Sequence, residues 1–472
     1  MLYSFSFNGI KKPYLYTEKG KRFSAFAPIT RNIQTIPGRP GGYLSSSDTQ
    51  VRVIEQPFFI KASNRLALRK LEEELAAWLV TAEPKPLILD DEPDRIYYAV
   101  VEESVELEPI DEFARGVITF ICPDPYKYAQ QETIIPLTAT TTVNVSGTVK
   151  TEPITQVTLS ADTTFLTISN GNDVNRIGRP KDAIETTYEP ETRKLWDQMG
   201  SVTGWGTTNS IEEGVNTGSL TSNGHAFVAS TYGTGSNWHG PALKKSIGES
   251  LQDFKIEASL TQIGSNGQVG SVEVALLDAS NNFVAKILLS KRAANSYGIW
   301  GRFRAGTVAN GYDILNTNGG YDWVYQYFDG MLRLERKGNQ WSAWIGKNTA
   351  NGYDSVSKAT WVDKFNIATT PITQVQVQIW QHGNLPTTSQ SVEDIKVYKL
   401  NPETGLPIIA RTGDIIVFDH KNDVITKNGE EITKDKAFIG DYFSLNPGQN
   451  SILIEPSAAV GSAEMRWRNK WL

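Results

Sequence analysis

The chain has 472 residues, which is too long for one hydrophobic core and predicts roughly three domains of about 150 residues each. Its net charge of −6 argues against a protein that wraps nucleic acid, because such binding needs a basic surface. A single cysteine, Cys122, excludes an internal disulfide framework and a cysteine-based zinc cluster, and it fits synthesis in a reducing cytosol.

The first region comprises residues 1–135, and its opening residues alternate like a strand. They lack a basic stretch ahead of an apolar run, and no segment of the chain is long and apolar enough to cross a membrane. We therefore expect neither a signal peptide nor a membrane span, so release from the cell would follow lysis.

Helical spacing of apolar residues predicts one helix within residues 63–80, which covers one face of a sheet. Ser63 or Asn64 can cap its N-terminus by accepting a bond from a free N–H group, and Pro84 and Pro86 lie beyond its end. The apolar stripe consists of Leu68, Leu71, Leu75, Trp78 and Leu79.

Residues 30–47 form a different kind of segment, because they contain little that could enter a core. Prolines and glycines are concentrated in Ile36-Pro37-Gly38-Arg39-Pro40-Gly41-Gly42. This composition predicts a long loop or an extended hairpin, and long ordered loops are usually functional.

The second region is split between residues 136–187 and 401–472. Each piece contains short strands, and Asn428-Gly429 predicts a type I′ hairpin turn. Neither piece has enough strands to close a sandwich, so we predict that the two fold together.

The third region, residues 188–400, lies between those pieces and has polar, proline-marked borders. Its strands alternate cleanly, and turn signals recur at intervals of about ten residues, which indicates a β-sandwich or jelly roll. An insertion of this kind is tolerated where its ends lie close together.

Four motifs occur in an order that resembles one known family. They are the Pro-Gly-rich segment 36–42, Glu92-Pro93-Asp94-Arg95, Cys122-Pro123-Asp124-Pro125-Tyr126, and the ending from Gly413-Asp414-Ile415-Ile416 to Asn428-Gly429-Glu430. Together they resemble distal tail proteins of long-tailed phages that infect Gram-positive hosts, over about half of the chain. The resemblance implies a mainly β protein. It would have an N-terminal β-sandwich-type domain with one α-helix, a split galectin-like β-sandwich and an inserted concanavalin-like jelly roll.

The resemblance also implies a function in the virion. Family members form a hexameric ring at the tail tip that joins the tail tube protein to the tail-associated lysin or fibre protein, and DNA passes through the ring. A ring needs head-to-tail contacts between copies, so the protruding residues 30–47 could reach across that contact as a belt, with Ile36 to Gly42 as the candidate assembly residues. Longer members carry carbohydrate-binding-like domains at the place of the insert, which implies host cell-wall polysaccharide as a partner. We expect no specific nucleic-acid partner and no membrane partner.

Within the insert, the meander 321–345 suggests a saccharide site. If Asp329-Gly330 and Gly338-Asn339 are two-residue turns, Gln326 lies beside Arg333 and Arg333 beside Trp344 on the polar face. A flat ring flanked by donors suits a pyranose, although a surface Arg–Trp stack without a ligand explains the same pattern. Two glycine-containing loops compete as sites, namely Trp238-His239-Gly240 and Trp380-Gln381-His382-Gly383.

The chain shows no signature of catalysis. Nucleophile-elbow, zinc and phosphate-loop motifs are absent, and Glu335 and Glu273 do not form a recognisable glycosidase motif. We expect no enzyme and no cofactor, apart from a structural calcium ion that Asp253, Asp278 or Asp394 could bind. Two alternatives stay open: a free-standing non-enzymatic lectin or adhesin, and an insert that is purely architectural.

Overall fold

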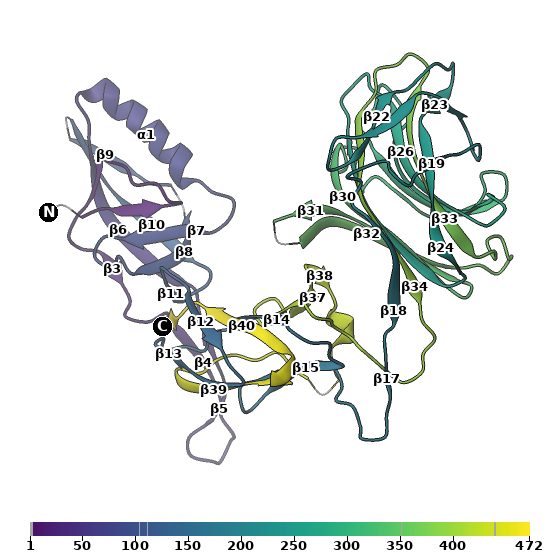
Figure 1. Cartoon of the computed structure of the whole chain (residues 1–472). Helices are drawn as coiled ribbons and strands as arrows, with labels where there is room; N and C mark the ends of the chain where they lie inside the picture. Colours follow the sequence, from purple (N-terminus) through teal and green to yellow (C-terminus); the bar gives the residue numbers. More distant parts are fainter. Residues whose placement is uncertain (1–2, 103, 111, 351, 439) are drawn as a thin grey trace. The chain divides into compact units, whose positions relative to one another are not determined.

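The computed structural model describes residues 3–102, 104–110, 112–350, 352–438 and 440–472 (Figure 1). The chain forms two compact units. The first comprises Met1–Pro180, Ile409–Lys427 and Glu431–Leu472, and the second comprises Lys181–Ile408 and Asn428–Glu430. The fold is mainly β, as predicted. In the described part of the chain, no helix has the length and apolarity needed to span a membrane.

The N-terminal part of the first unit is a twisted sheet. Cys122 ends one of its central strands and is fully buried, and burial raises the pKa of its thiol to about 12. The strand order is β1 (Phe5–Phe7), β7 (Lys85–Leu89), β8 (Arg95–Glu102), β10 (Phe113–Cys122), β6 (Arg52–Lys61) and β2 (Leu15–Thr17). Four short strands join it: β3 (Arg22–Phe23), β9 (Leu107–Ile110), β11 (Lys127–Ala129) and β41 (Lys470–Trp471).

Helix α1 (Arg65–Leu79) covers one face of this sheet, as predicted (Figure 1). The side chain of Asn64 caps the helix by accepting a hydrogen bond from the Ala67 N–H at 2.8 Å. Trp78 stacks on Phe5 with a centroid separation of 5.6 Å and donates its indole N–H to the carbonyl oxygen of Phe7. The helix therefore seals the core from the side that the sheet leaves open.

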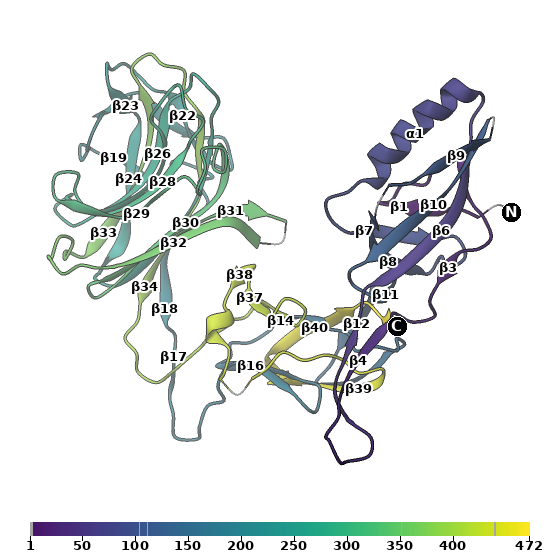
Figure 2. The same cartoon turned by 180° about the vertical axis from the view of Figure 1, so that it is seen from behind.

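Residues 29–49 form an extended hairpin, which confirms one of the two forms predicted for this segment. Strands β4 (Ile29–Gln34) and β5 (Tyr43–Thr49) pair antiparallel with each other and join no larger sheet (Figure 2). Ile33, Ile36, Tyr43 and Leu44 are exposed along it. We call residues 29–49 the arm.

The rest of the first unit is a sandwich built from both ends of the chain, and its core combines residues 137–177 with residues 410–467. Asn428 and Gly429 both have positive φ, as a type I′ turn requires. One sheet contains β12 (Thr133–Leu137), β40 (Val460–Trp467), β14 (Ile154–Leu159), β36 (Ile415–Asp419), β37 (Val424–Lys427) and β38 (Glu430–Glu431). The other contains β13 (Thr140–Val145), β39 (Gly448–Glu455), β15 (Phe165–Ser169) and β16 (Val174–Gly178). Two 3₁₀ turns, η1 (Thr433–Asp435) and η2 (Ser457–Ala459), connect these strands.

The second unit is a larger sandwich of two sheets, which we call sheet A and sheet B. Sheet A consists of β21 (Ser219–Ser222), β22 (Phe227–Thr231), β34 (Ser389–Leu400), β25 (Phe254–Ile263), β30 (Tyr327–Lys337), β31 (Gln340–Thr349) and β32 (Gly352–Val362), with β18 (Glu191–Asp197) on β34. Sheet B consists of β19 (Gly206–Thr207), β24 (Ala242–Leu251), β33 (Ile372–His382), β26 (Gly270–Leu277), β27 (Phe283–Lys291), β28 (Trp300–Gly306) and β29 (Gly311–Thr317), with β20 (Val215–Asn216) and β23 (Trp238–Gly240) at its edge. At the entry and exit of this unit, β17 (Thr187–Tyr188) and β35 (Leu406–Pro407) run parallel side by side.

One part of the predicted meander is wrong. Asp329-Gly330 is not a turn but lies inside β30, which pairs with β25 along its length, so Gln326 does not lie beside Arg333. The reason is close packing of backbones. A Cβ on Gly330 would lie 2.2 Å from the carbonyl oxygen of Gly346 on the next strand, so the glycine permits strand contact instead of a reversal. The second turn is confirmed, and Arg333 pairs with Trp344 as predicted.

Candidate functional site

Three rows of side chains cross the outer face of sheet B. Strand alternation produces them, because the intervening residues, such as Val272, Val274 and Phe303, point into the core of the sandwich. The registers of the paired strands define the rows as Trp380–Ser271–Ser290–Trp300, Gln378–Glu273–Leu288–Arg302–Asn316 and Gln376–Ala275–Lys286–Arg304–Asp313.

Residues 208–214 cover one half of this face. Thr208 Oγ1 donates to the side-chain oxygen of Gln376 at 2.5 Å, and Gln376 Nε2 donates to the carbonyl oxygen of Ser210 at 2.8 Å. Lys286 Nζ lies 3.5 Å from Glu212 Oε2 and 3.2 Å from Glu273 Oε2. This half is therefore a buried polar layer. The side chains in it are buried, with at most 6% exposed: Gln376, Gln378, Glu273 and Lys286.

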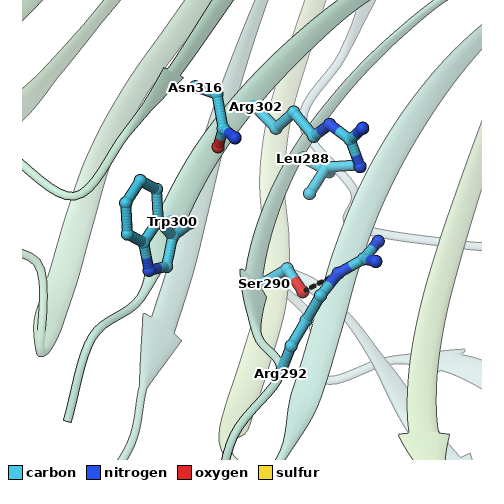
Figure 3. Close-up of a pocket in the computed structure, with 6 residues that line it drawn as sticks. All are labelled: Leu288, Ser290, Arg292, Trp300, Arg302 and Asn316. Atoms are coloured by element: carbon cyan, nitrogen blue, oxygen red, sulfur yellow. Dashed lines mark hydrogen bonds between the residues drawn. The ribbon is translucent and has the colours of Figure 1, made fainter. Parts of the chain in front are cut away.

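The other half of the face is open and hollowed into a pocket of about 340 Å³ (Figure 3). The indole of Trp300, 41% exposed, forms one wall, and the guanidinium groups of Arg292 and Arg302 lie on the opposite side. The pocket is lined by Leu288, Ser290, Arg292, Trp300, Arg302 and Asn316. An exposed aromatic ring therefore faces two fork-shaped donors across a space large enough for a sugar-sized ligand.

Asp313 positions one of these guanidinium groups. Arg302 donates Nε to Asp313 Oδ2 at 2.9 Å and its NH2 lies 2.8 Å from the same oxygen, while Arg304 Nε donates to Oδ1 at 2.9 Å. Burial alone would raise the pKa of Asp313, but the two guanidinium groups outweigh it and lower the pKa. Asp313 is thus a carboxylate that orients Arg302 at the pocket wall.

Arg292 is held more loosely. Its Nε donates to Ser290 Oγ at 3.3 Å (Figure 3), and its NH2 lies 3.7 Å from Glu213 Oε2. Almost half of its side chain is exposed. Arg292 can therefore turn toward a ligand at little cost.

The predicted pair Arg333 and Trp344 lies on the outer face of sheet A, away from this pocket. The guanidinium carbon of Arg333 is 5.3 Å from the Trp344 ring centroid, and Arg333 Nε donates to Glu257 at 2.9 Å. Trp344 also packs edge-on against Tyr353. The geometry is that of an Arg–Trp stack, and saccharide binding by these residues stays a prediction.

Trp238, His239, Trp380 and His382 do not lie in two separate loops, so that expectation is wrong. They belong to the paired strands β23 and β33, in which Trp238 is opposite His382 and the two rings meet edge-to-face at 5.0 Å. His239 and Trp380 are each 2% exposed and cannot stack on a ligand. Gly214 lies against the ring of Trp380, where an added Cβ would come within 3.3 Å of it.

The two glutamates considered for catalysis cannot act as a pair. Glu335 lies on the outer face of sheet A and Glu273 on the outer face of sheet B, with the core between them. Burial raises the pKa of Glu335, whereas Lys286 lies beside Glu273.

The three aspartates considered for calcium already accept hydrogen bonds. Asp253 accepts from the Gly338 N–H, Asp278 from the Ser280 and Asn282 N–H groups, and Asp394 from the Trp196 indole. Among the described residues no group of three or more His, Cys, Asp or Glu could hold a metal ion. Calcium binding stays a prediction.

Both ends of the chain match models of phage tail proteins. Residues 11–122 match the phage tail protein RIFT-related domain, and residues 385–471 match the C-terminal domain of the siphovirus-type tail component. The distal tail protein of Bacillus phage SPP1 is 29% identical over 132 residues, which are 28% of this chain. Residues 11–122 and 385–471 are domains of the distal tail protein type of siphophages. This match spans 52% of the SPP1 protein, about half of its length.

Two solved structures are also similar. One is the crystal structure of SPP1 Dit, described as a paradigm of the hub adsorption apparatus of phages that infect Gram-positive bacteria; it is 22% identical, covers 38% of this chain and 75% of its own, and has a TM-score of 0.35. The other is the CBM2 module of the evolved Dit of Lactobacillus casei BL23 phage J-1; it is 16% identical, covers 46% of this chain and 98% of its own, and has a TM-score of 0.39. Both TM-scores lie below 0.5.

The pocket residues of sheet B were missed from the sequence, although a signal for them exists. In residues 300–305, large polar or aromatic side chains (Trp300, Arg302, Arg304) alternate with Gly301, Phe303 and Ala305. This alternation predicts a strand with one face that carries an indole and two guanidinium groups. The sequence does not show which strand pairs with this one, and it is that pairing that brings Ser290 and Arg292 to the same face.

Proposed function

We propose that this chain is a distal tail protein that assembles as a ring at the tail tip of a siphophage. Six copies are the number that the family resemblance implies. At the tail tip it joins the tail tube to the tail-associated lysin or fibre, and its insert binds a saccharide of the host cell wall. The family matches support the hub role. The pocket of sheet B, with an exposed indole opposite two guanidinium groups, is the observation that supports adhesion. We propose no catalytic role.

The arm is the element best suited to ring assembly. A two-stranded hairpin alone is marginally stable in water, yet this one exposes Ile33, Ile36, Tyr43 and Leu44. Burying these side chains against a neighbouring copy would stabilise both the hairpin and the contact. A head-to-tail contact of this kind closes into a ring when the rotation between copies allows it.

Deleting residues 37–42, the tip of the arm, tests the ring. We expect the deletion to convert rings into monomers, seen by light scattering coupled to size exclusion and by electron microscopy. The deletion removes no residue of the hydrophobic cores, so the monomer should still be folded and unfold cooperatively, although without the stabilisation that the ring contact adds. If the deletion variant still forms intact rings, the tip of the arm is not needed for ring assembly and the proposed belt role is wrong.

Adhesion is tested with the fluorescently labelled full chain on a panel of Gram-positive cells, before and after their wall polysaccharides are stripped. Binding should vanish on stripping, and Trp300→Ala should weaken it at least about tenfold, since a tryptophan anchor commonly supplies 2 kcal/mol or more. Trp344→Ala tests the alternative site on sheet A and should bind normally if the ligand lies in the pocket of sheet B. Loss of binding in Trp344→Ala but not in Trp300→Ala would place the saccharide site on sheet A. If the full chain binds no strain, the insert has an architectural role and adhesion is ruled out.

A further inference from the structure

We infer that the pocket of sheet B takes an anionic saccharide, whose phosphate or carboxylate lies between Arg292 and Arg302 while a sugar ring stacks on Trp300. The inference rests on the proposed saccharide binding and adds the charge of the ligand. Two observations support the inference. They are the hydrogen-bonding character of the side chains that line the pocket and the net charge of the ionised groups at its wall.

The lining offers many donors and few acceptors. Arginine side chains donate only, and two of the lining residues, Arg292 and Arg302, are arginines. Ser290 and Asn316 supply the side-chain acceptors of the lining, and no carboxylate is among the lining residues in the described part of the chain. Neutral sugar hydroxyls need acceptors as well as donors. Phosphate and carboxylate oxygens only accept, so they match this wall better.

The charged groups of the open half, taken by themselves, leave a positive surplus. Arg302 and Arg304 share the single carboxylate of Asp313, so these groups sum to +1 (two positive charges and one negative). Arg292 stands 3.7 Å from Glu213 with nearly half of its side chain exposed, so its guanidinium group can leave that ion pair for a ligand. The buried groups Glu212, Glu273 and Lys286 sum to −1 (two negative charges and one positive), but they belong to the half that residues 208–214 cover, and none of them lines the pocket.

The geometry also favours one orientation of the ligand. Figure 3 shows both guanidinium groups on one side of the pocket and the indole on the other. Guanidinium forks bind phosphate and carboxylate in a bidentate manner, and Asp313 keeps Arg302 in place for such a contact. The anionic group would therefore contact the arginine wall, and the flat face of the ring would lie against Trp300.

The test uses the labelled full chain on a strain that it binds. Soluble competitors are added at constant ionic strength in matched pairs: glycerol phosphate against glycerol, and galacturonate against galactose. We expect one anionic member to displace the protein at millimolar concentration while both neutral members fail. Competition by glycerol phosphate would identify the anionic group of the ligand as a phosphate, and competition by galacturonate would identify it as a carboxylate. Raising the salt from 50 to 300 mM should also weaken binding about tenfold, because charge attraction at an open pocket is screened.

Variants locate the effect. Arg292→Gln should weaken binding about tenfold, because it removes charge-assisted hydrogen bonds, and Arg292→Lys should keep part of the affinity. Arg193→Gln is the control, because it removes the same charge from β18 of sheet A and leaves the pocket of sheet B unchanged. Loss with Trp300→Ala but not with Arg292→Gln, together with equal competition by neutral sugars and no effect of salt, would overturn the inference and leave saccharide binding standing. No binding to any strain would overturn both.

Discussion

At the scale of single residues, His420 shows how burial sets a titration. Its ring is 3% exposed, lies 3.9 Å from the Phe443 ring centroid and accepts the Phe443 N–H through Nδ1 at 3.1 Å. Burial lowers the pKa of His420 to about 4, although Asp419 acts in the opposite direction. The folded protein thus holds this histidine neutral where an unfolded chain would protonate it.

Acid should therefore destabilise the sandwich that contains His420. The unfolded chain takes up a proton below pH 6.5 and the folded chain only near pH 4, so stability present above 6.5 is lost as the pH falls between these values. The loss should approach about 3 kcal/mol. His420→Asn keeps an acceptor for the Phe443 N–H but cannot titrate. Urea unfolding at pH 7 and pH 4.5 should show a smaller loss for the variant, and equal losses would contradict the assignment.

At the scale of elements, strand β30 shows that a turn dipeptide can serve packing between strands. Asp329-Gly330 continues the strand because β25 and β31 pair on both of its sides. Gly330 is needed where the backbone of Gly346 comes close. Local propensity for a turn is overridden here by two neighbouring strands.

Gly330→Ala should destabilise the insert by about 2 kcal/mol or more, because the added methyl group must push two paired backbones apart. Gly206→Ala, in β19 of the same unit, is the control, since a Cβ there meets nothing within 4 Å. Differential scanning calorimetry of both variants measures the effect. Equal melting of the two variants would show that the strands relax around the new methyl group.

At the scale of the whole molecule, the insert has a hydrophobic core of its own, and the two ends of the insert lie side by side. Thr187 is opposite Leu406 and Tyr188 opposite Pro407 in the parallel pair of β17 and β35. The insert core contains residues of 199–397 only, and the sandwich core of the first unit contains none of them. Excision should therefore leave the first unit folded.

Replacing residues 189–405 by a linker of about four Gly and Ser residues should preserve ring assembly, because such a linker spans the short distance between adjacent strands. The shortened protein should lose binding to host cells. Electron microscopy and the cell-binding assay measure the two outcomes separately. Aggregation of the shortened chain would show that the first unit needs the insert to fold.

Much of the local structure could be predicted because it depends on residues close in sequence. The helix and its cap at Asn64, the turn at Asn428-Gly429 and the pairing of Arg333 with Trp344 across a short turn are all of this kind. The family could also be recognised, since its motifs lie in contiguous segments. The boundaries of three domains at 135, 187 and 400 stay a prediction.

The sequence by itself therefore determined the class of fold, the family and the alternation of each strand. Only the tertiary structure decided which polar face is open. Residues 208–214 bury Gln376 through contacts such as the Gln376–Ser210 bond, which joins residues 166 positions apart, and Gly214 of the same segment lies against the buried ring of Trp380. Trp300 stays exposed because that segment covers only the other half of sheet B. Alternation follows from strand geometry with a period of two, whereas burial of a face depends on which distant segment packs on it.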